Sequence, residues 1–209
     1  MLRFFDLANA ISLAALLSAA ACCCLAISRL PAYAVVALIV AGVADLFDGQ
    51  VARRLKRTDE QRRFGSRIDS LVDVCSFGFA PVALLYATGL QQPLDLLLLG
   101  LFLCCTVWRL AYFDTVGMET AGSARYFTGL PTTYVALVLP LVFLTAFAGA
   151  AWLWMSLRGA TLVLALAMVS PFRFRKPGLI VYAFFVLLAI GVASVLIWHA
   201  PRLHQELRI

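Results

Sequence analysis

The sequence of 209 residues is poor in charge, since only 13% of its residues are Asp, Glu, Lys or Arg, against about 25% in a typical soluble domain. It also lacks internal repeats, low-complexity tracts and the polar linkers that separate soluble domains. By contrast, 63% of the residues are hydrophobic and the mean hydropathy is +0.94. This composition excludes an ordinary cytosolic domain, a disordered chain and a secreted disulfide scaffold.

Histidine is scarce and cysteine follows no ligand pattern. The two histidines, His199 and His204, lie near the C-terminal end of the sequence, far from any acidic pair. The cysteines all fall inside apolar runs without a CxxC spacing, and there they behave as small hydrophobic residues. We therefore expect neither disulfides nor a zinc site. The six expected free thiols are Cys22, Cys23, Cys24, Cys75, Cys104 and Cys105.

Long apolar runs dominate the sequence, and a transmembrane helix needs about 20 such residues. The run 151–171 contains Arg158 and is the weakest candidate. We expect an all-α, polytopic membrane bundle of six to seven transmembrane helices, in a single integral-membrane domain over residues 1–209. We expect the first run to be an uncleaved span rather than a signal peptide. The runs cover residues 7–28, 32–52, 68–90, 93–113, 131–150, 151–171 and 178–199.

Basic residues are distributed unevenly between these runs. If the N-terminus, 53–67, 109–130 and 171–178 share one side, that side holds 13 of the 17 Lys and Arg residues. The positive-inside rule then makes it the cytoplasmic side of the cell's inner membrane. Seven spans would put the C-terminus outside and six would put it inside. We assign the net charge of +6 to lipid headgroups rather than nucleic acid, with the basic segment 54–64 solvated near anionic headgroups.

Two pairs of aspartates interrupt the second and third runs. Asp45 and Asp48 are three residues apart, and Asp69 and Asp73 are four apart, so each pair shares one helix face. A short connection makes the two helices antiparallel neighbours, and the pairs can converge at the cytoplasmic edge. Converging carboxylates favour the binding of divalent cations that prefer oxygen ligands, namely Mg²⁺ or Mn²⁺. We expect two such ions. The alternative is that these residues face water or pair with nearby arginines.

Small residues accompany the acidic pairs. Gly49 follows Asp48, Ala52 lies close behind it, and Gly65 precedes Asp69 by one turn. Glycine inside a helix costs about 1 kcal/mol relative to alanine, so it indicates close approach of another group. That group is either a neighbouring helix or a ligand beside the acidic cluster.

Together these residues form a recognisable pattern over the motif region 45–73. Asp45-Leu-Phe-Asp48-Gly49-Gln-Val-Ala52-Arg53 and Gly65-Ser-Arg-Ile-Asp69-Ser-Leu-Val-Asp73 resemble the CDP-alcohol phosphotransferase motif, DxxDGxxAR followed by GxxxDxxxD. All eight fixed residues match. The segment between Arg53 and Gly65 is longer than in the common pattern of that family.

Within that family the chain is most similar to the phosphatidylserine synthase subgroup, through residues 69–81 and Arg109-Leu-Ala-Tyr-Phe-Asp114. The departures are Tyr112 and Asp114, where the subgroup has Arg and Asn. The resemblance implies transfer of the phosphatidyl group of CDP-diacylglycerol to the hydroxyl of L-serine, with release of CMP. Alternatives are a different acceptor (glycerol phosphate, inositol phosphate or another amino alcohol) or, in another class, a small cation transporter. The resemblance also implies a homodimer in the lipid bilayer.

The family's roles carry over onto matching positions. The metal site would consist of Asp45, Asp48, Asp69 and Asp73, with the first three as metal ligands. Asp73 would lie near metal and also act as the base, so that Asp69 and Asp73 are the catalytic pair. Since serine carries a carboxylate that needs a cation, Arg109 and Arg125 are the candidate acceptor-binding residues. The nucleotide-binding set implied by the resemblance is Asn9, Ser12, Asp48, Gly49, Ala52, Arg53 and Gly65.

Overall fold

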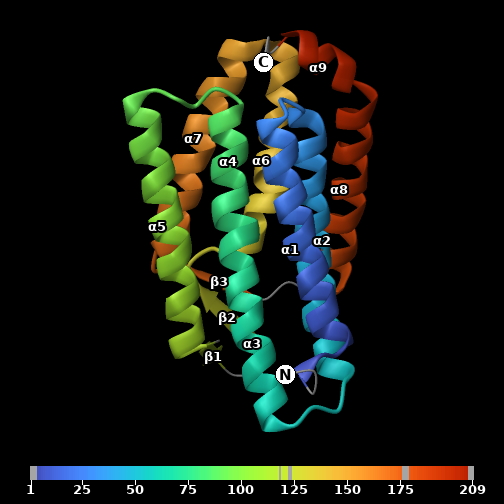
Figure 1. Ribbon diagram of the computed structural model, residues 1–209. Coiled ribbons are helices and arrows are strands. Elements are labelled where there is room, and N and C mark those ends of the chain that lie inside the picture. Colours follow the sequence, from blue (N-terminus) through green and yellow to red (C-terminus); the bar gives the residue numbers. More distant parts are fainter. Residues whose placement is uncertain (1–3, 118, 122–123, 176–178, 207–209) are drawn as a thin grey trace.

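A computed structural model describes residues 4–117, 119–121, 124–175 and 179–206. Its helices run up and down along one axis and form an elongated bundle (Figure 1), which confirms the expected all-α membrane architecture. A π-helical segment, η2 (Val74–Phe79), joins α3 to α4, and the 3-10 segments η3 (Thr132–Tyr134) and η4 (Leu144–Ala148) flank α6. The α-helices are α1 (Leu7–Ile27), α2 (Pro31–Arg54), α3 (Asp59–Asp73), α4 (Ala80–Ala87), α5 (Pro93–Val116), α6 (Val135–Phe143), α7 (Ala150–Val169), α8 (Leu179–Trp198) and α9 (Ala200–Glu206).

Each apolar run identified in the sequence is helical over most of the residues that the structure describes. Five segments of the described chain are long and apolar enough to cross a bilayer, namely α1, α2, the continuous stretch Asp59–Ala87, α5 and α7. Thr132–Ala148 and Ala183–Trp198 are shorter apolar helices that stand beside them (Figure 1). The start of α1 and the helix α9 lie at opposite ends of the bundle, as in the seven-span alternative.

The outer surface of the bundle is apolar. Large side chains such as Leu97 (71% exposed), Trp108 (72%) and Leu187 (69%) point away from the core on α5 and α8. Soluble monomers rarely expose apolar patches of this extent, whereas lipid tails solvate them. The chain is an integral membrane protein.

The helices pack through small residues and free thiols. A Cβ atom built on Gly42 of α2 would lie 2.5 Å from the Cβ of Ala136 on α6, so only glycine permits this approach. Close contact through small residues is how membrane helices gain packing energy. All six cysteines are free thiols, as expected from the sequence, and Cys22 and Cys105 are buried.

The charge inside the weakest candidate span has a partner. Arg158 of α7 donates from Nε to Oδ1 of Asp95 at 2.6 Å and from Nη2 to Oδ2 at 2.9 Å. Asp95 is only 3% exposed, near the start of α5. This two-point ion pair joins α5 to α7 at the end of the bundle opposite the N-terminus, which explains an arginine in an apolar helix.

A small antiparallel sheet was not expected from the sequence. β1 (Glu119–Ala121), β2 (Ala124–Thr128) and β3 (Arg173–Arg175) pair in that order, with Tyr126 opposite Arg175. The segments 109–130 and 171–178 lack apolar periodicity, so sequence alone predicted connections there. Their strands pair across a long sequence separation and lie at the same end of the bundle as the start of α3 (Figure 1).

Candidate active site

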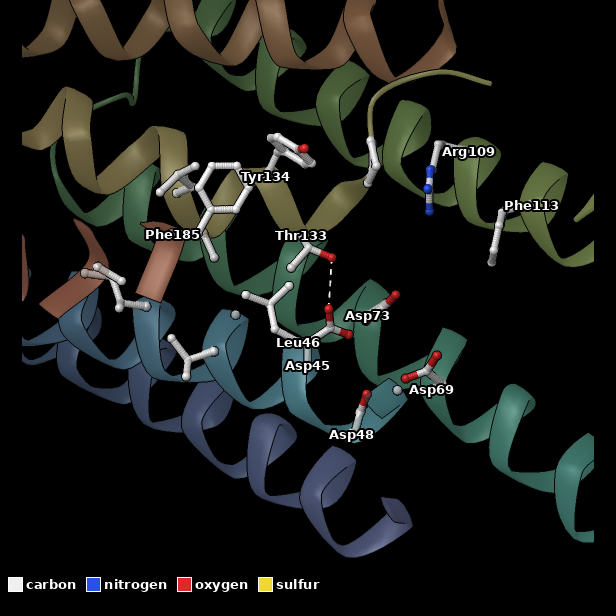
Figure 2. A pocket seen from close by; sticks show the side chains of 18 of the residues that line it. Asp45, Leu46, Asp48, Asp69, Asp73, Arg109, Phe113, Thr133, Tyr134 and Phe185 are labelled. Carbon is white, nitrogen blue, oxygen red and sulfur yellow. Dashed lines mark hydrogen bonds between the residues drawn. The ribbon is translucent and has the colours of Figure 1, made fainter. Parts of the chain in front are cut away.

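Local sequence signals bring the two acidic pairs to the same end of the bundle. α2 ends at Arg54, and Thr58 caps the start of α3. The Thr58 hydroxyl oxygen accepts a hydrogen bond from the backbone N–H of Gln61, and the side-chain oxygen of Gln61 accepts one from the backbone N–H of Thr58. This capping box starts α3 at Asp59, well before the apolar run at 68. The chain therefore turns within residues 55–58 and presents the aspartates of α2 and α3 to each other (Figure 2).

Three of the four aspartates form a compact cluster. One carboxylate oxygen from each of Asp45, Asp48 and Asp69 lies within 4.8 Å of the other two. Ligand oxygens of a bound Mg²⁺ are about 3–4 Å apart at metal–oxygen distances of about 2.0–2.1 Å. Small side-chain rotations would therefore complete such a site, so the donor set fits a hard divalent cation.

Asp73 lies beside this cluster but is not part of it. Its Oδ1 atom is buried and makes no hydrogen bond within the described chain, and Figure 2 shows the carboxylate beside those of Asp45 and Asp69. Asp73 is the last residue of α3, directly before the π-helical segment η2. Such segments are frequent at functional sites because they redirect a helix locally. A carboxylate oxygen without a partner is available to a ligand or a proton.

Hydroxyl groups from other helices orient two of the clustered carboxylates. Ser12 of α1 donates a hydrogen bond to Oδ2 of Asp48 at 2.7 Å. Thr133 of η3 donates one to Oδ2 of Asp45 at 2.9 Å (Figure 2). Groups that hold metal ligands in place are a regular part of metal sites, and here they come from both sides of α2.

The first cavity, of about 230 Å³, is polar at one end and apolar at the other. The four aspartates and Arg109 lie at its polar end (Figure 2). Arg53 also lines this cavity. Its apolar wall comes from α2, α6 and α8, three helices that also expose apolar side chains on the outside of the bundle. The apolar lining residues are Ile39, Val43, Leu46, Leu137, Phe185 and Ala189.

Arg109 is the buried cation that lines this first cavity, whereas Arg53 is exposed. Arg109 is only 6% exposed, its Nε atom has no hydrogen-bond partner among the described residues, and its guanidinium lies 5.1 Å from the ring centre of Phe113. Asp114 stands where the subgroup resembled in sequence has Asn. Its carboxylate accepts a hydrogen bond from Ser70 at 2.8 Å, which connects α5 to α3. The side chain of Arg125, the other acceptor candidate, lies outside the described part of the structure.

The second cavity, of about 420 Å³, lies on the other side of the acidic cluster, between α1, the end of α2 and the start of α3. A Cβ atom built on Gly49 would meet no atom within 4 Å. The space beside Gly49 is therefore open, and close helix packing does not explain this glycine. The cavity is lined by all seven nucleotide-binding candidates, Asn9, Ser12, Asp48, Gly49, Ala52, Arg53 and Gly65.

Sequence reasoning missed several residues of the site. Arg57 belongs to the segment 54–64 that we expected to be solvated, but its side chain is only 9% exposed and lines the second cavity. Ser66 lines the same cavity, and Thr133 contacts Asp45. No pattern in the sequence marked these residues, because each reaches the site through a fold contact.

Several known proteins are similar in sequence to the chain, and three of them illustrate the range. The CDP-diacylglycerol--serine O-phosphatidyltransferase of Mycobacterium leprae is 31% identical over 185 residues, which cover 82% of this chain and 61% of that protein. The yeast Saccharomyces cerevisiae protein of the same name is 38% identical over 105 residues, 47% of this chain and 37% of its own length. The archaetidylserine synthase of Methanothermobacter thermautotrophicus is 35% identical over 115 residues, 54% and 47% respectively. The chain thus spans less than two thirds of each relative.

The family comparison covers almost all of the chain. The family model for CDP-alcohol phosphatidyltransferase matches residues 5–201, a range that contains both aspartate pairs and the residues lining both cavities. The chain belongs to the CDP-alcohol phosphatidyltransferase family.

Proposed function

We propose that this protein transfers the phosphatidyl group of CDP-diacylglycerol to the hydroxyl of L-serine, giving phosphatidylserine and CMP. The observation that carries the proposal is the cluster of Asp45, Asp48 and Asp69, whose carboxylate oxygens lie within 4.8 Å of one another between two cavities of different character. The names of the relatives, which specify serine as the acceptor, support the choice of alcohol.

The two cavities suit the two halves of the lipid substrate. The second cavity, with open space beside Gly49, accepts the cytidine. The diphosphate then lies at the acidic cluster beside Arg53, which lines both cavities. The apolar wall of the first cavity, with Leu46 and Phe185, leads the acyl chains toward the bilayer.

We assign Mg²⁺ or Mn²⁺, in two sites, as the cofactor. Asp45, Asp48 and Asp69 would hold the metal, with Asp73 beside them, because hard oxygen donors at this density suit these ions. When bound, the metal neutralises the diphosphate and polarises the phosphoryl oxygens. Without a metal ion, the negative charges of the diphosphate and of the four carboxylates would repel one another.

Asp73 is the proposed base. The hydroxyl of serine is a weak nucleophile until a group within hydrogen-bond reach accepts its proton, and Oδ1 of Asp73 is without a partner in the described chain. In the transfer, the serine oxygen bonds to the phosphorus of the phosphatidyl group. The bond from that phosphorus to the bridging oxygen breaks, and its electron pair leaves with CMP. The proton passes to Asp73 and then to water.

Arg109 is the proposed partner of the serine carboxylate. Its guanidinium lines the same cavity as Asp73, and its Nε–H is unused within the described chain. An arginine binds a carboxylate through two parallel hydrogen bonds, which would direct the serine hydroxyl toward the acidic cluster. Arg125 stays a second candidate for this role.

Orientation and assembly follow from the same reasoning. We propose that residues 1–209 act as one domain in the cytoplasmic membrane. The basic end of the bundle, which carries the acidic cluster, would face the cytoplasm, following the positive-inside rule. We further propose a homodimer, by analogy with the family.

One assay tests the reaction. The purified protein in detergent, with Mn²⁺ or Mg²⁺ and CDP-diacylglycerol, should release CMP only when L-serine is added. Release of CMP only with glycerol phosphate, inositol phosphate or another amino alcohol would replace serine as the acceptor. Cation flux in proteoliposomes without any CMP release would instead indicate a transporter and overturn the proposal.

A further inference from the structure

We propose that Arg57 recognises the nucleoside of the substrate, with its Nε–H donating a hydrogen bond to an acceptor on the cytosine base or to the 2′-hydroxyl of the ribose. The proposal rests on the assignment of the second cavity to cytidine under the proposed function. It adds a specificity residue from the segment between the two halves of the motif, where the sequence suggested only headgroup contacts.

The side chain of Arg57 is buried and incompletely bonded. Its Nη2 atom donates to Oδ1 of Asp6 at 2.5 Å and to Oδ1 of Asn9 at 3.2 Å. The side chain is 9% exposed and lines the second cavity. Its Nε atom is buried and has no partner among the described residues. A buried charged donor left unsatisfied is costly, so the arrangement is typical of a site that a ligand completes.

The contacts of α1 place Arg57 one helical turn away from the acidic cluster. Ser12 contacts Asp48, and Asn9, three residues earlier, contacts Arg57. One helical turn is about 5.4 Å, so Arg57 stands about that far along α1 from the carboxylate.

On α3 the same offset recurs. Asp69 belongs to the cluster, and Gly65, one turn earlier, faces the guanidinium, since a Cβ atom built there would lie 2.9 Å from Nη1 of Arg57. Two helices thus place Arg57 about one turn from the metal-binding carboxylates. With the diphosphate at those carboxylates, the part of the substrate one turn away is the ribose and base.

The neighbouring Asn9 is already occupied. Its Nδ2 atom donates to the carbonyl oxygen of Phe4 at 2.7 Å, and its Oδ1 atom accepts from Arg57. Its carboxamide is therefore held in one orientation. Asn9 and Asp6 position the guanidinium, and the free Nε–H of Arg57 is the donor left to read the nucleoside.

The test compares Arg57→Lys and Arg57→Gln with wild type, using the full chain in detergent with Mn²⁺. Arg57→Lys keeps a cation next to Asp6 but lacks the Nε–H of a planar guanidinium. Arg63→Gln is the matched control, since Arg63 is an exposed arginine on α3 that lines neither cavity. Isothermal titration with CMP, dCMP, UMP and ribose 5-phosphate measures affinity, and the unfolding temperature monitors folding.

We expect both Arg57 variants to bind CMP about tenfold or more weakly, the loss typical of one hydrogen bond to a charged group, with Arg63→Gln unchanged. A smaller loss for dCMP than for CMP places the acceptor on the ribose 2′-hydroxyl, and a smaller loss for UMP places it on N3 of cytosine. A loss for every nucleotide but not for ribose 5-phosphate places it on an atom shared by the bases. Unchanged CMP affinity in Arg57→Lys, or an equal loss for all four ligands, would overturn the proposal.

Binding and turnover separate this proposal from the reaction. If wild type binds CMP and Arg57→Lys does not, but serine yields no CMP release, the serine reaction fails and the role of Arg57 stands. If serine-dependent turnover occurs and Arg57→Lys keeps the CMP affinity of wild type, the role of Arg57 fails and the reaction stands.

Discussion

Thr133 donates a hydrogen bond of 2.9 Å to Asp45, although the two residues are 88 positions apart. Thr133 lies in η3, shortly after strand β2, while Asp45 begins the acidic motif on α2. The C-terminal half of the chain thus orients a carboxylate of the N-terminal half. Ser12 holds Asp48 in the same way from α1.

Thr133→Val should weaken metal binding without unfolding the protein. Loss of a group that orients a metal ligand typically lowers metal affinity by about 10- to 100-fold. The Mn²⁺ concentration for half-maximal CMP release should rise by that factor. Thr133→Ser keeps the hydroxyl and is the control. The prediction fails if the valine variant needs no more Mn²⁺ than the serine variant.

Asp69→Asn and Asp73→Asn should both abolish turnover while the protein still inserts and purifies. They should differ in metal binding, because Asp69 belongs to the carboxylate cluster and Asp73 does not. Removal of a general base costs about 10²- to 10⁴-fold in rate, so Asp73→Asn should lose kcat by that factor while it still binds Mn²⁺. Asp69→Asn should lose Mn²⁺ affinity as well. Near-normal turnover in either variant would remove that residue from the site.

Gly49→Ala should stabilise the helix and impair the enzyme. Alanine is favoured over glycine inside a helix by about 1 kcal/mol, and the added methyl group meets no atom. The same methyl group occupies space in both cavities, so KM for CDP-diacylglycerol should rise several-fold. Gly100→Ala is the control, since Gly100 is exposed on α5 and equally uncrowded. It should raise the unfolding temperature without changing KM.

Arg109→Gln should raise KM for L-serine about tenfold or more, because a charged hydrogen-bonding partner of the serine carboxylate is lost. KM for CDP-diacylglycerol should change much less. Arg67→Gln, which removes an exposed arginine of α3, is the control and should leave both values unchanged. Equal effects on both substrates in Arg109→Gln would argue against an acceptor site at this residue.

Asp6 predicts a pH dependence of stability. Burial raises the pKa of Asp6, but hydrogen bonds from Arg57 and from the backbone N–H of Asn9 lower it by more, so the pKa lies below its ordinary value. Such a carboxylate stabilises the fold fully above its unfolded pKa of about 3.9, and the contribution is lost as pH falls through the folded value. The unfolding temperature of wild type should therefore exceed that of Asp6→Asn by a constant amount above about pH 5 and approach it below about pH 4. A gap that persists unchanged in acid would contradict this account.

Local signals in the sequence were sufficient for the helices and the acidic motif. Runs of about 20 apolar residues predicted the long apolar helices of the bundle, but not the short α9, and Pro31 and Pro93 mark the starts of α2 and α5. The spacing of the aspartates fixed their helix faces. The resemblance to the family then identified seven residues that all line one cavity.

The contacts that complete the site join segments far apart in the sequence. The hydrogen bond of Thr133 to Asp45, the burial of Arg57 against Asp6 and the pairing of β2 with β3 have no periodic signal.

The sequence by itself determined that the chain is a membrane bundle with two acidic helices, because hydropathy and helical spacing are properties of neighbouring residues. Only the tertiary structure decided which hydroxyl and which arginine reach those acids, because helix packing sets the distance between segments that no local pattern connects.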